Sequence, residues 1–218
     1  MSIKMRIKIA KIKNKIKKKN KLLNLFINNK SFAILSFVLV FGLVVGSIVF
    51  NNSSEVFSFK ISSLFLNNFE MRKSLNFFDL FTESIFTTFI FVLVIFLMGL
   101  SAIGLTLIPP IIFFKGYCLG ILQNFLCTNY GIKGFLFELL ILLPGIFISS
   151  IATILMAKEA IKISNIFSNL LLNISHCQNN EKYVKTYLLK TGLVLILTVS
   201  AAFIDVVLNF LFLRFFSF

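Results

Sequence analysis

Residues 31–50 read SFAILSFVLVFGLVVGSIVF, a run of twenty residues without a charged side chain. A helix rises about 1.5 Å per residue, so a run of this length reaches across a hydrocarbon core about 30 Å thick. The whole chain has the same character, because it is 58% hydrophobic and 14% charged, whereas soluble domains are about 25% charged. The sequence therefore predicts an integral membrane protein.

Further apolar blocks follow this first one, and together they predict an all-α bundle of five transmembrane helices. The predicted spans cover residues 31–50, 85–108, 110–128, 135–157 and 191–213. We place the boundary between the second and third spans at Pro109 and Pro110, because proline lacks an amide donor and clashes with the preceding helical turn. For the same reason we expect Pro144 to kink the fourth span and to free a backbone carbonyl.

The amino-terminal segment, residues 1–30, carries eleven of the 22 basic residues and no acidic residue. A polybasic segment beside a span is an orientation signal and a contact for anionic lipid, so we expect it in the cytoplasm and not on nucleic acid. Residues 31–218 would then form one five-span membrane domain. We predict a multi-pass protein of the cell membrane, with a cytoplasmic amino terminus and an extracytoplasmic carboxyl terminus.

The segments between spans differ in charge in the direction that this orientation requires. Residues 51–84 hold three basic and four acidic residues, whereas residues 158–190 hold five basic and two acidic. The first segment is therefore expected outside and the second inside. Apolar residues recur at helical spacing in the outer segment, from Phe57 to Phe69, which predicts one or two short amphipathic helices at the outer interface.

Three ionisable residues, Lys115, Glu138 and Asp205, fall inside predicted spans. A charge there costs roughly 2.5–3.5 kcal/mol on insertion scales, so each needs a partner or access to water. Lys115 either extends to the cytoplasmic headgroups or binds a carboxylate or the carbonyl freed near Pro144. Both acids fall in the outer halves of their spans, which makes a direct pair with Lys115 awkward. Asp205 has either a hydrogen-bonded structural role or a place on a proton or ion pathway.

Glycine pairs at a spacing of four occur in two spans: Gly42 with Gly46, and Gly116 with Gly120. Small residues at this spacing let two helix backbones approach closely in a membrane. We expect these glycines to lie where helices of the bundle touch.

Groups that carry catalysis are scarce in this sequence. The single histidine, His176, lies beside Cys177 in a polar segment. One His and one Cys do not complete a metal site, and adjacent residues lack the geometry of a nucleophile with its base. We therefore expect no enzyme activity, no metal and no cofactor.

The order of glycines, prolines and one lysine in residues 98–161 resembles the stage II sporulation protein M family. The matching positions are Gly99, Gly104, Pro109, Lys115, Gly116, Gly120, Gly131, Gly134, Leu143 and Pro144. The chain departs from the family pattern at Gly145, where the resemblance leads us to expect Asn or Gln. It departs again in its longer lysine-rich amino terminus.

The resemblance implies a non-enzymatic membrane scaffold. Such a protein would anchor a peptidoglycan-remodelling complex, with sporulation proteins D and P or equivalent wall hydrolases, at the septal membrane during engulfment in endospore formation. We expect the partner on the outer segment, residues 51–84, and on the carboxyl-terminal tail, and crosslinks from Phe69 or Asp79 would capture it. The alternative is the membrane subunit of a transport permease. Without a visible internal repeat, a stand-alone secondary transporter is disfavoured.

Overall fold

The computed structural model describes residues 30–171 and 180–212, with the side chains of residues 180–182 excepted. His176, Cys177 and the basic segment up to residue 29 lie outside the described residues. The chain divides into two units, Met1–Ile34 and Leu35–Phe218. All contacts described below lie within the second unit.

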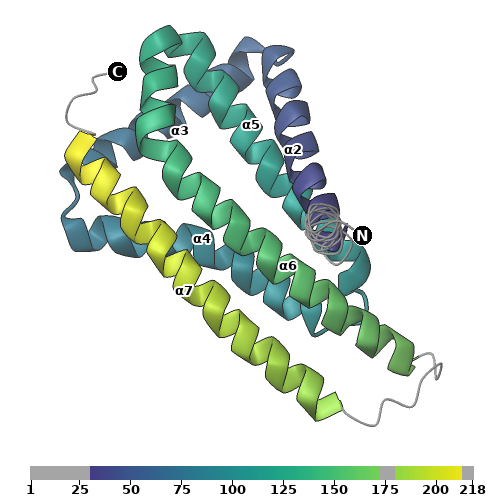
Figure 1. Ribbon diagram of the computed structural model, residues 1–218. Helices are drawn as coiled ribbons and strands as arrows, with labels where there is room; N and C mark the ends of the chain where they lie inside the picture. Colours follow the sequence, from purple (N-terminus) through teal and green to yellow (C-terminus); the bar gives the residue numbers. More distant parts are fainter. Residues whose placement is uncertain (1–29, 172–179, 213–218) are drawn as a thin grey trace, which may run out of the picture. The chain divides into compact units, whose positions relative to one another are not determined.

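The described residues are helical almost throughout (Figure 1). The elements are α2 (Lys30–Asn51), α3 (Glu55–Ser74), α4 (Phe77–Gly99), α5 (Gly104–Phe137), the π-helical turn η1 (Glu138–Leu142), α6 (Leu143–Leu171) and α7 (Asn180–Phe212). Four stretches are long and apolar enough to cross a membrane: Lys30–Asn51, Phe77–Gly99, Gly104–Leu171 and Tyr183–Phe212. An all-helical fold is thus confirmed for the described residues, and its composition is that of a membrane protein.

The third of these stretches contains a reversal of the chain at Gly131. Gly131 has φ 53° and ψ −129°, a backbone conformation that glycine adopts without the steric penalty of a side chain. Figure 1 shows the chain turning back between α5 and α6, and the two helices pack against each other. A side chain at Gly134 would meet the backbone carbonyl of Leu126, so the second glycine lets the two arms of the turn close.

The break between α4 and α5 lies at residues 100–103, so the boundary predicted at Pro109 and Pro110 is wrong. Both prolines lie inside α5, near its start. Because proline has no amide hydrogen, the carbonyls of Leu105 and Thr106, four residues earlier, have no helical donor. Both residues are exposed, so these carbonyls are not enclosed in the bundle. A contact from α6 stabilises the true break: the Ser164 hydroxyl accepts a hydrogen bond from the Leu105 amide at 2.7 Å and donates to the Ser101 carbonyl at 2.8 Å.

Helices α2 and α5 pack through their glycine pairs. A side chain at Gly42 would meet the backbone carbonyl of Phe113, and one at Gly116 would meet that of Leu39. Gly46 and Gly120 make the same kind of approach one turn further along. Only residues without a side chain allow backbones this close, which is the arrangement that small residues provide between membrane helices.

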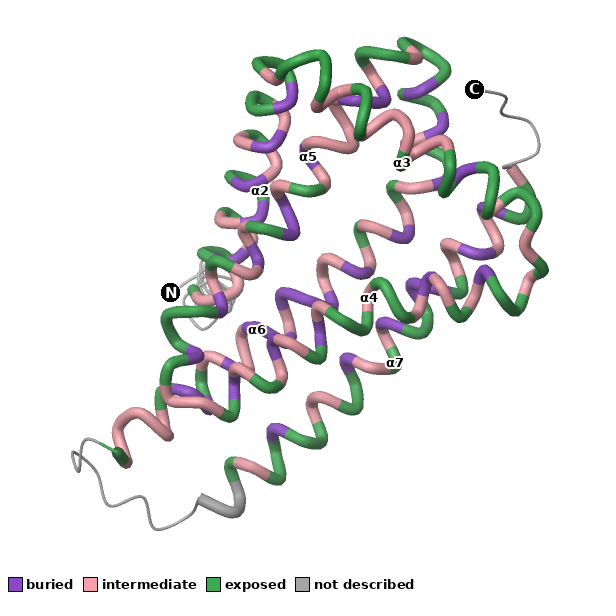
Figure 2. Tube along the Cα trace, turned by 180° about the vertical axis from the view of Figure 1, so that it is seen from behind, coloured by how far each residue is buried: buried purple, intermediate pink, exposed green. Residues whose placement is uncertain are grey.

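Helix α6 is the central element of the second unit, because it packs against α4, α5 and α7. Figure 2 shows buried positions recurring along its length. Many of these positions are small residues: Gly145, Ser149, Ala152, Thr153, Ala157, Ala160 and Ser164. At the far end of the bundle, the Tyr187 ring stacks on Phe96 with centroids 5.4 Å apart, and its hydroxyl donates to the Phe96 carbonyl at 3.1 Å.

Helix α3 lies over an aromatic cluster at the end of the bundle that carries the Gly131 turn. The buried residues of this cluster are Phe50, Phe69, Phe125, Leu126, Phe137 and Ile141. Phe65 stands at its centre and contacts the rings of Phe125 and Phe137. Val56 and Phe59 of the same helix are 66% and 74% exposed, so α3 carries apolar side chains on both faces.

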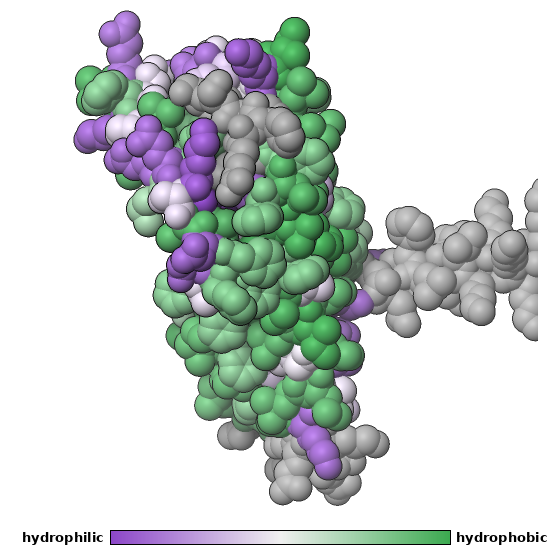
Figure 3. Space-filling model, turned by 90° about the vertical axis from the view of Figure 1, so that its left-hand side faces the viewer, coloured by the Kyte–Doolittle hydropathy of each residue, from purple (hydrophilic) through white to green (hydrophobic). Residues whose placement is uncertain are grey.

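The surface of the bundle is broadly apolar. Figure 3 shows hydrophobic residues over most of the face that it presents, with hydrophilic residues gathered near its upper end. Exposed large hydrophobic residues occur on every helix, among them Phe37 and Phe41 on α2 and Phe86 on α4. In water such a surface would be unfavourable, whereas hydrocarbon solvates it.

Candidate functional site

A cluster of charged and polar side chains links α3 to α4 and α7. The Arg72 guanidinium on α3 lies 3.4 Å from Glu83 Oε1 on α4 and 3.6 Å from Asp205 Oδ2 on α7. The Ser84 hydroxyl donates to Asp205 Oδ2 at 2.6 Å, and the Asn209 amide donates to Asp205 Oδ1 at 3.2 Å. Asp205 therefore has both a hydrogen-bonded position and a cation nearby, as a carboxylate inside a membrane requires.

Asp205 lies beside Gly145, the position at which an Asn or Gln was expected from sequence. A Cβ atom added to Gly145 would lie 3.0 Å from Asp205 Cβ and 3.3 Å from its Oδ1. The carboxylate of Asp205 thus occupies the space beside α6 that a longer side chain at position 145 would need. The polar group beside Gly145 is therefore the Asp205 side chain of α7.

Lys115 is buried, with 6% of its surface exposed. Its ammonium donates to the Thr153 hydroxyl at 2.6 Å and to the Ser149 carbonyl at 3.2 Å, both on α6. It also lies 5.5 Å from the centre of the Phe91 ring on α4, within range of a cation–π contact. The expected extension of Lys115 to the cytoplasmic headgroups is therefore wrong. The alternative prediction, that Lys115 binds a backbone carbonyl near Pro144, is closer to what is observed. The carbonyl, however, belongs to Ser149 and not to a residue before Pro144.

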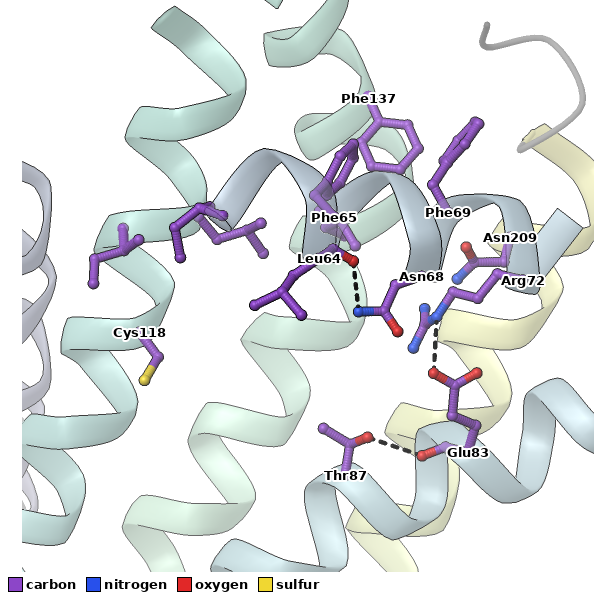
Figure 4. Close-up of a pocket in the computed structure, with 14 residues that line it drawn as sticks. Leu64, Phe65, Asn68, Phe69, Arg72, Glu83, Thr87, Cys118, Phe137 and Asn209 are labelled. Atoms are coloured by element: carbon purple, nitrogen blue, oxygen red, sulfur yellow. Dashed lines mark hydrogen bonds and ion pairs between the residues drawn. The ribbon is translucent and has the colours of Figure 1, made fainter. Parts of the chain in front are cut away.

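Two adjoining cavities lie between these groups. The outer cavity, of about 480 Å³, is lined mainly by α3, α4 and α5, with Leu142 of η1 and Asn209 of α7 completing its wall (Figure 4). The inner cavity, of about 290 Å³, holds both Lys115 and Asp205 in its wall. The two share the lining residues Arg72, Thr87, Cys118, Leu122 and Leu142.

The remaining predicted site residues lie apart from this cluster. Glu138 begins the π-helical turn, lines neither of these two cavities, and has a buried Oε2 atom without a hydrogen-bond partner among the described residues. Pro144 follows the π-helical turn, in which the Leu143 amide bonds to the Glu138 carbonyl five residues back. The predicted irregularity near Pro144 thus takes the form of a widened turn. Gly116 and Gly120 face α2, as described above.

Sequence reasoning did not single out Arg72, Glu83, Ser84, Thr153 or Asn209 as site residues. Asn209 is one helical turn from Asp205, so the i,i+4 spacing was a usable signal. Ser84 and Thr153 meet their partners only through the packing of different helices, 121 and 38 residues apart in sequence. No local pattern marks such contacts.

The cluster offers hydrogen bonding and charge, but no metal-ligand set. Within the described ranges, no group of three His, Cys, Asp or Glu residues lies close enough to hold a metal ion. The comparisons with known proteins found no matching family model, no matching curated protein and no matching solved structure.

Proposed function

We propose that this chain is a non-enzymatic membrane scaffold that crosses the bilayer five times. The apolar stretch Gly104–Leu171 counts as two spans in this proposal, because 68 residues far exceed one crossing and Gly131 interrupts the helix. With the basic amino terminus in the cytoplasm, α3 and the Gly131 turn face outward. The placement of α3 and the Gly131 turn on the same side is supported by the contact of α3 with the aromatic residues beside Gly131.

The observation that carries the scaffold proposal is the attachment of α3. Arg72 ties the helix to α4 and α7 through two carboxylates, and Phe65 and Phe69 pack it onto the aromatic cluster. Val56 and Phe59 remain exposed on the other side. A helix held in this way offers a fixed apolar surface at the outer membrane interface, where apolar and aromatic anchors support binding of a partner.

The partner proposed here is a wall hydrolase, equivalent to sporulation proteins D and P, recruited during engulfment. The resemblance described for residues 98–161 supports this identity. The partner would supply the chemistry, and this chain would supply the membrane position.

Photo-crosslinking from α3 tests the proposal in sporulating cells. Phe69 is a poor position for the probe because it is only 6% exposed. The probe therefore belongs at Phe59 on α3, and the exposed Asp79 in the first turn of α4 gives a second position on the same side. We expect crosslinks to a cell-wall hydrolase from these positions and none from the exposed Lys162 on α6. Capture of that hydrolase only from Lys162 would reject the outer surface as its binding site.

A second candidate function is the membrane subunit of a transport permease. The inner cavity favours it, because Lys115 and Asp205 both line a space within the bundle, and ionisable residues inside membranes often mark transport pathways. An ATPase that copurifies with the chain would favour this candidate over the scaffold.

A further inference from the structure

The buried lysine and the two cavities together form a site that the scaffold proposal does not use. We propose that the cavities bind a single-chain amphiphile with an acidic head, of the long-chain fatty acid class. The head would pair with Lys115 in the inner cavity, and the chain would occupy the outer cavity. This inference does not rest on the proposed scaffold function.

The charge of Lys115 is the first argument. None of the ion pairs among the described residues includes Lys115; its contacts are a hydroxyl, a carbonyl and an aromatic ring. Asp205 lines the same cavity, but its two oxygens accept from Ser84 and Asn209 and it shares Arg72 with Glu83, so its described partners lie on α3, α4 and α7 and do not include Lys115. An acidic group beside Lys115 would offset the cost of a cation at this depth.

A second donor lies near the position proposed for the head. Thr88 on α4 lines the inner cavity and is half-buried. A carboxylate accepts hydrogen bonds on both of its oxygens. The ammonium and a threonine hydroxyl therefore offer donors from two helices to the same group.

The shape and lining of the outer cavity are the third argument. Its walls are mainly apolar, with Ile61, Leu64, Phe65, Ile121, Leu122 and Phe137 among the lining residues. A volume of about 480 Å³ falls in the lower part of the range of roughly 300–1,000 Å³ seen for small-ligand pockets. Such a space suits one hydrocarbon chain.

Entry is possible from the surface of the bundle. Cys118 lies one turn beyond Lys115 on α5, lines both cavities and is exposed. Thr87 on α4, which also lines both cavities, is exposed as well. The cavities therefore open between α4 and α5. In the proposed arrangement this opening faces the lipid, in which a fatty acid dissolves.

Cys118 also supplies the readout for a test. In a full-length variant with Cys127→Ser and Cys177→Ser, held in phosphatidylcholine nanodiscs, the rate of maleimide labelling reports access to the cavities. Sodium oleate at about ten times its Kd should slow this labelling about tenfold, because the open fraction falls by the factor 1 + [L]/Kd. Methyl oleate, which lacks the charge, and acetate, which lacks the chain, should leave the rate unchanged.

Two controls complete the experiment. A cysteine introduced by Phe114→Cys in the cysteine-free background reports general effects of oleate, because Phe114 is 57% exposed and lines neither of these two cavities. Lys115→Gln should abolish the protection of Cys118. If methyl oleate slowed the labelling of Cys118 as much as oleate does, the proposal would be overturned. This comparison uses only the protein that retains Lys115, so it holds even if Lys115→Gln fails to fold. Protection by acetate, or slowing at position 114 equal to that at Cys118, would overturn it as well.

Discussion

The Lys115 ammonium on α5 lies 2.6 Å from the Thr153 hydroxyl on α6, in the buried interior of the bundle. The same hydroxyl donates to the Ser149 carbonyl, which also accepts from Lys115. The three groups thus form a closed hydrogen-bonded set between two helices. Within that set, the charge of Lys115 is stabilised by dipoles and not by a carboxylate.

Removal of the threonine hydroxyl should therefore destabilise the protein, whereas removal of the lysine should not. We expect Thr153→Val to lower the free energy of unfolding by about 1–3 kcal/mol, because a buried ammonium loses an acceptor. Lys115→Met should be neutral or stabilising, since a buried charge is replaced by an apolar chain of similar length. Thermal unfolding of both single variants and the double variant, in one detergent, measures the coupling. Additive effects in the double variant would contradict the interaction.

The glycine contact between α2 and α5 predicts a strong position dependence for alanine. Gly116→Ala should lower stability by about 1–3 kcal/mol, because the new methyl group would meet the Leu39 carbonyl. Gly192→Ala is the matched control: apart from its chain neighbours and the backbone of its own helical turns, no atom lies within 4 Å of its added Cβ. Alanine also favours a helix by up to about 1 kcal/mol over glycine. Equal melting temperatures for the two variants would show that the α2–α5 approach is looser than described.

Arg72 should hold α3 on the bundle. Arg72→Met leaves Glu83 and Asp205 without their shared cation, so the two acids would repel each other and the helix would open more often. Hydrogen exchange of the α3 amides should accelerate about tenfold, while exchange in α6 stays unchanged. Lys60→Met, at an exposed position of the same helix, serves as the control. Unchanged exchange in Arg72→Met would assign the attachment of α3 to the aromatic cluster alone.

The helices of this fold could be predicted from composition, because long apolar runs in a charge-poor chain have few alternatives. The ends of the helices could not. Pro109 and Pro110 indicated a break by a local rule, but the break lies where Ser164 on α6 satisfies the backbone groups of residues 101 and 105. A contact between distant segments decided the boundary.

The same distinction applies to the site. Lys115 and Asp205 were identifiable from sequence because ionisable residues are rare inside apolar runs. Their partners were not identifiable, since Thr153 and Ser84 are ordinary residues that matter only through helix packing. The rule that long side chains reach for water failed for Lys115, because α6 offers it a hydroxyl and a carbonyl at shorter range.

Labelling of single cysteines in intact cells tests the first four crossings of the proposed topology most directly. Cysteines are introduced one at a time by Asn52→Cys, Lys133→Cys and Lys162→Cys, after Cys118, Cys127 and Cys177 have been replaced by serine. The proposed arrangement predicts that an impermeant maleimide labels positions 52 and 133 in intact cells, and position 162 only after permeabilisation. Labelling of positions 133 and 162 from the same side, or of positions 52 and 133 from opposite sides, would contradict it.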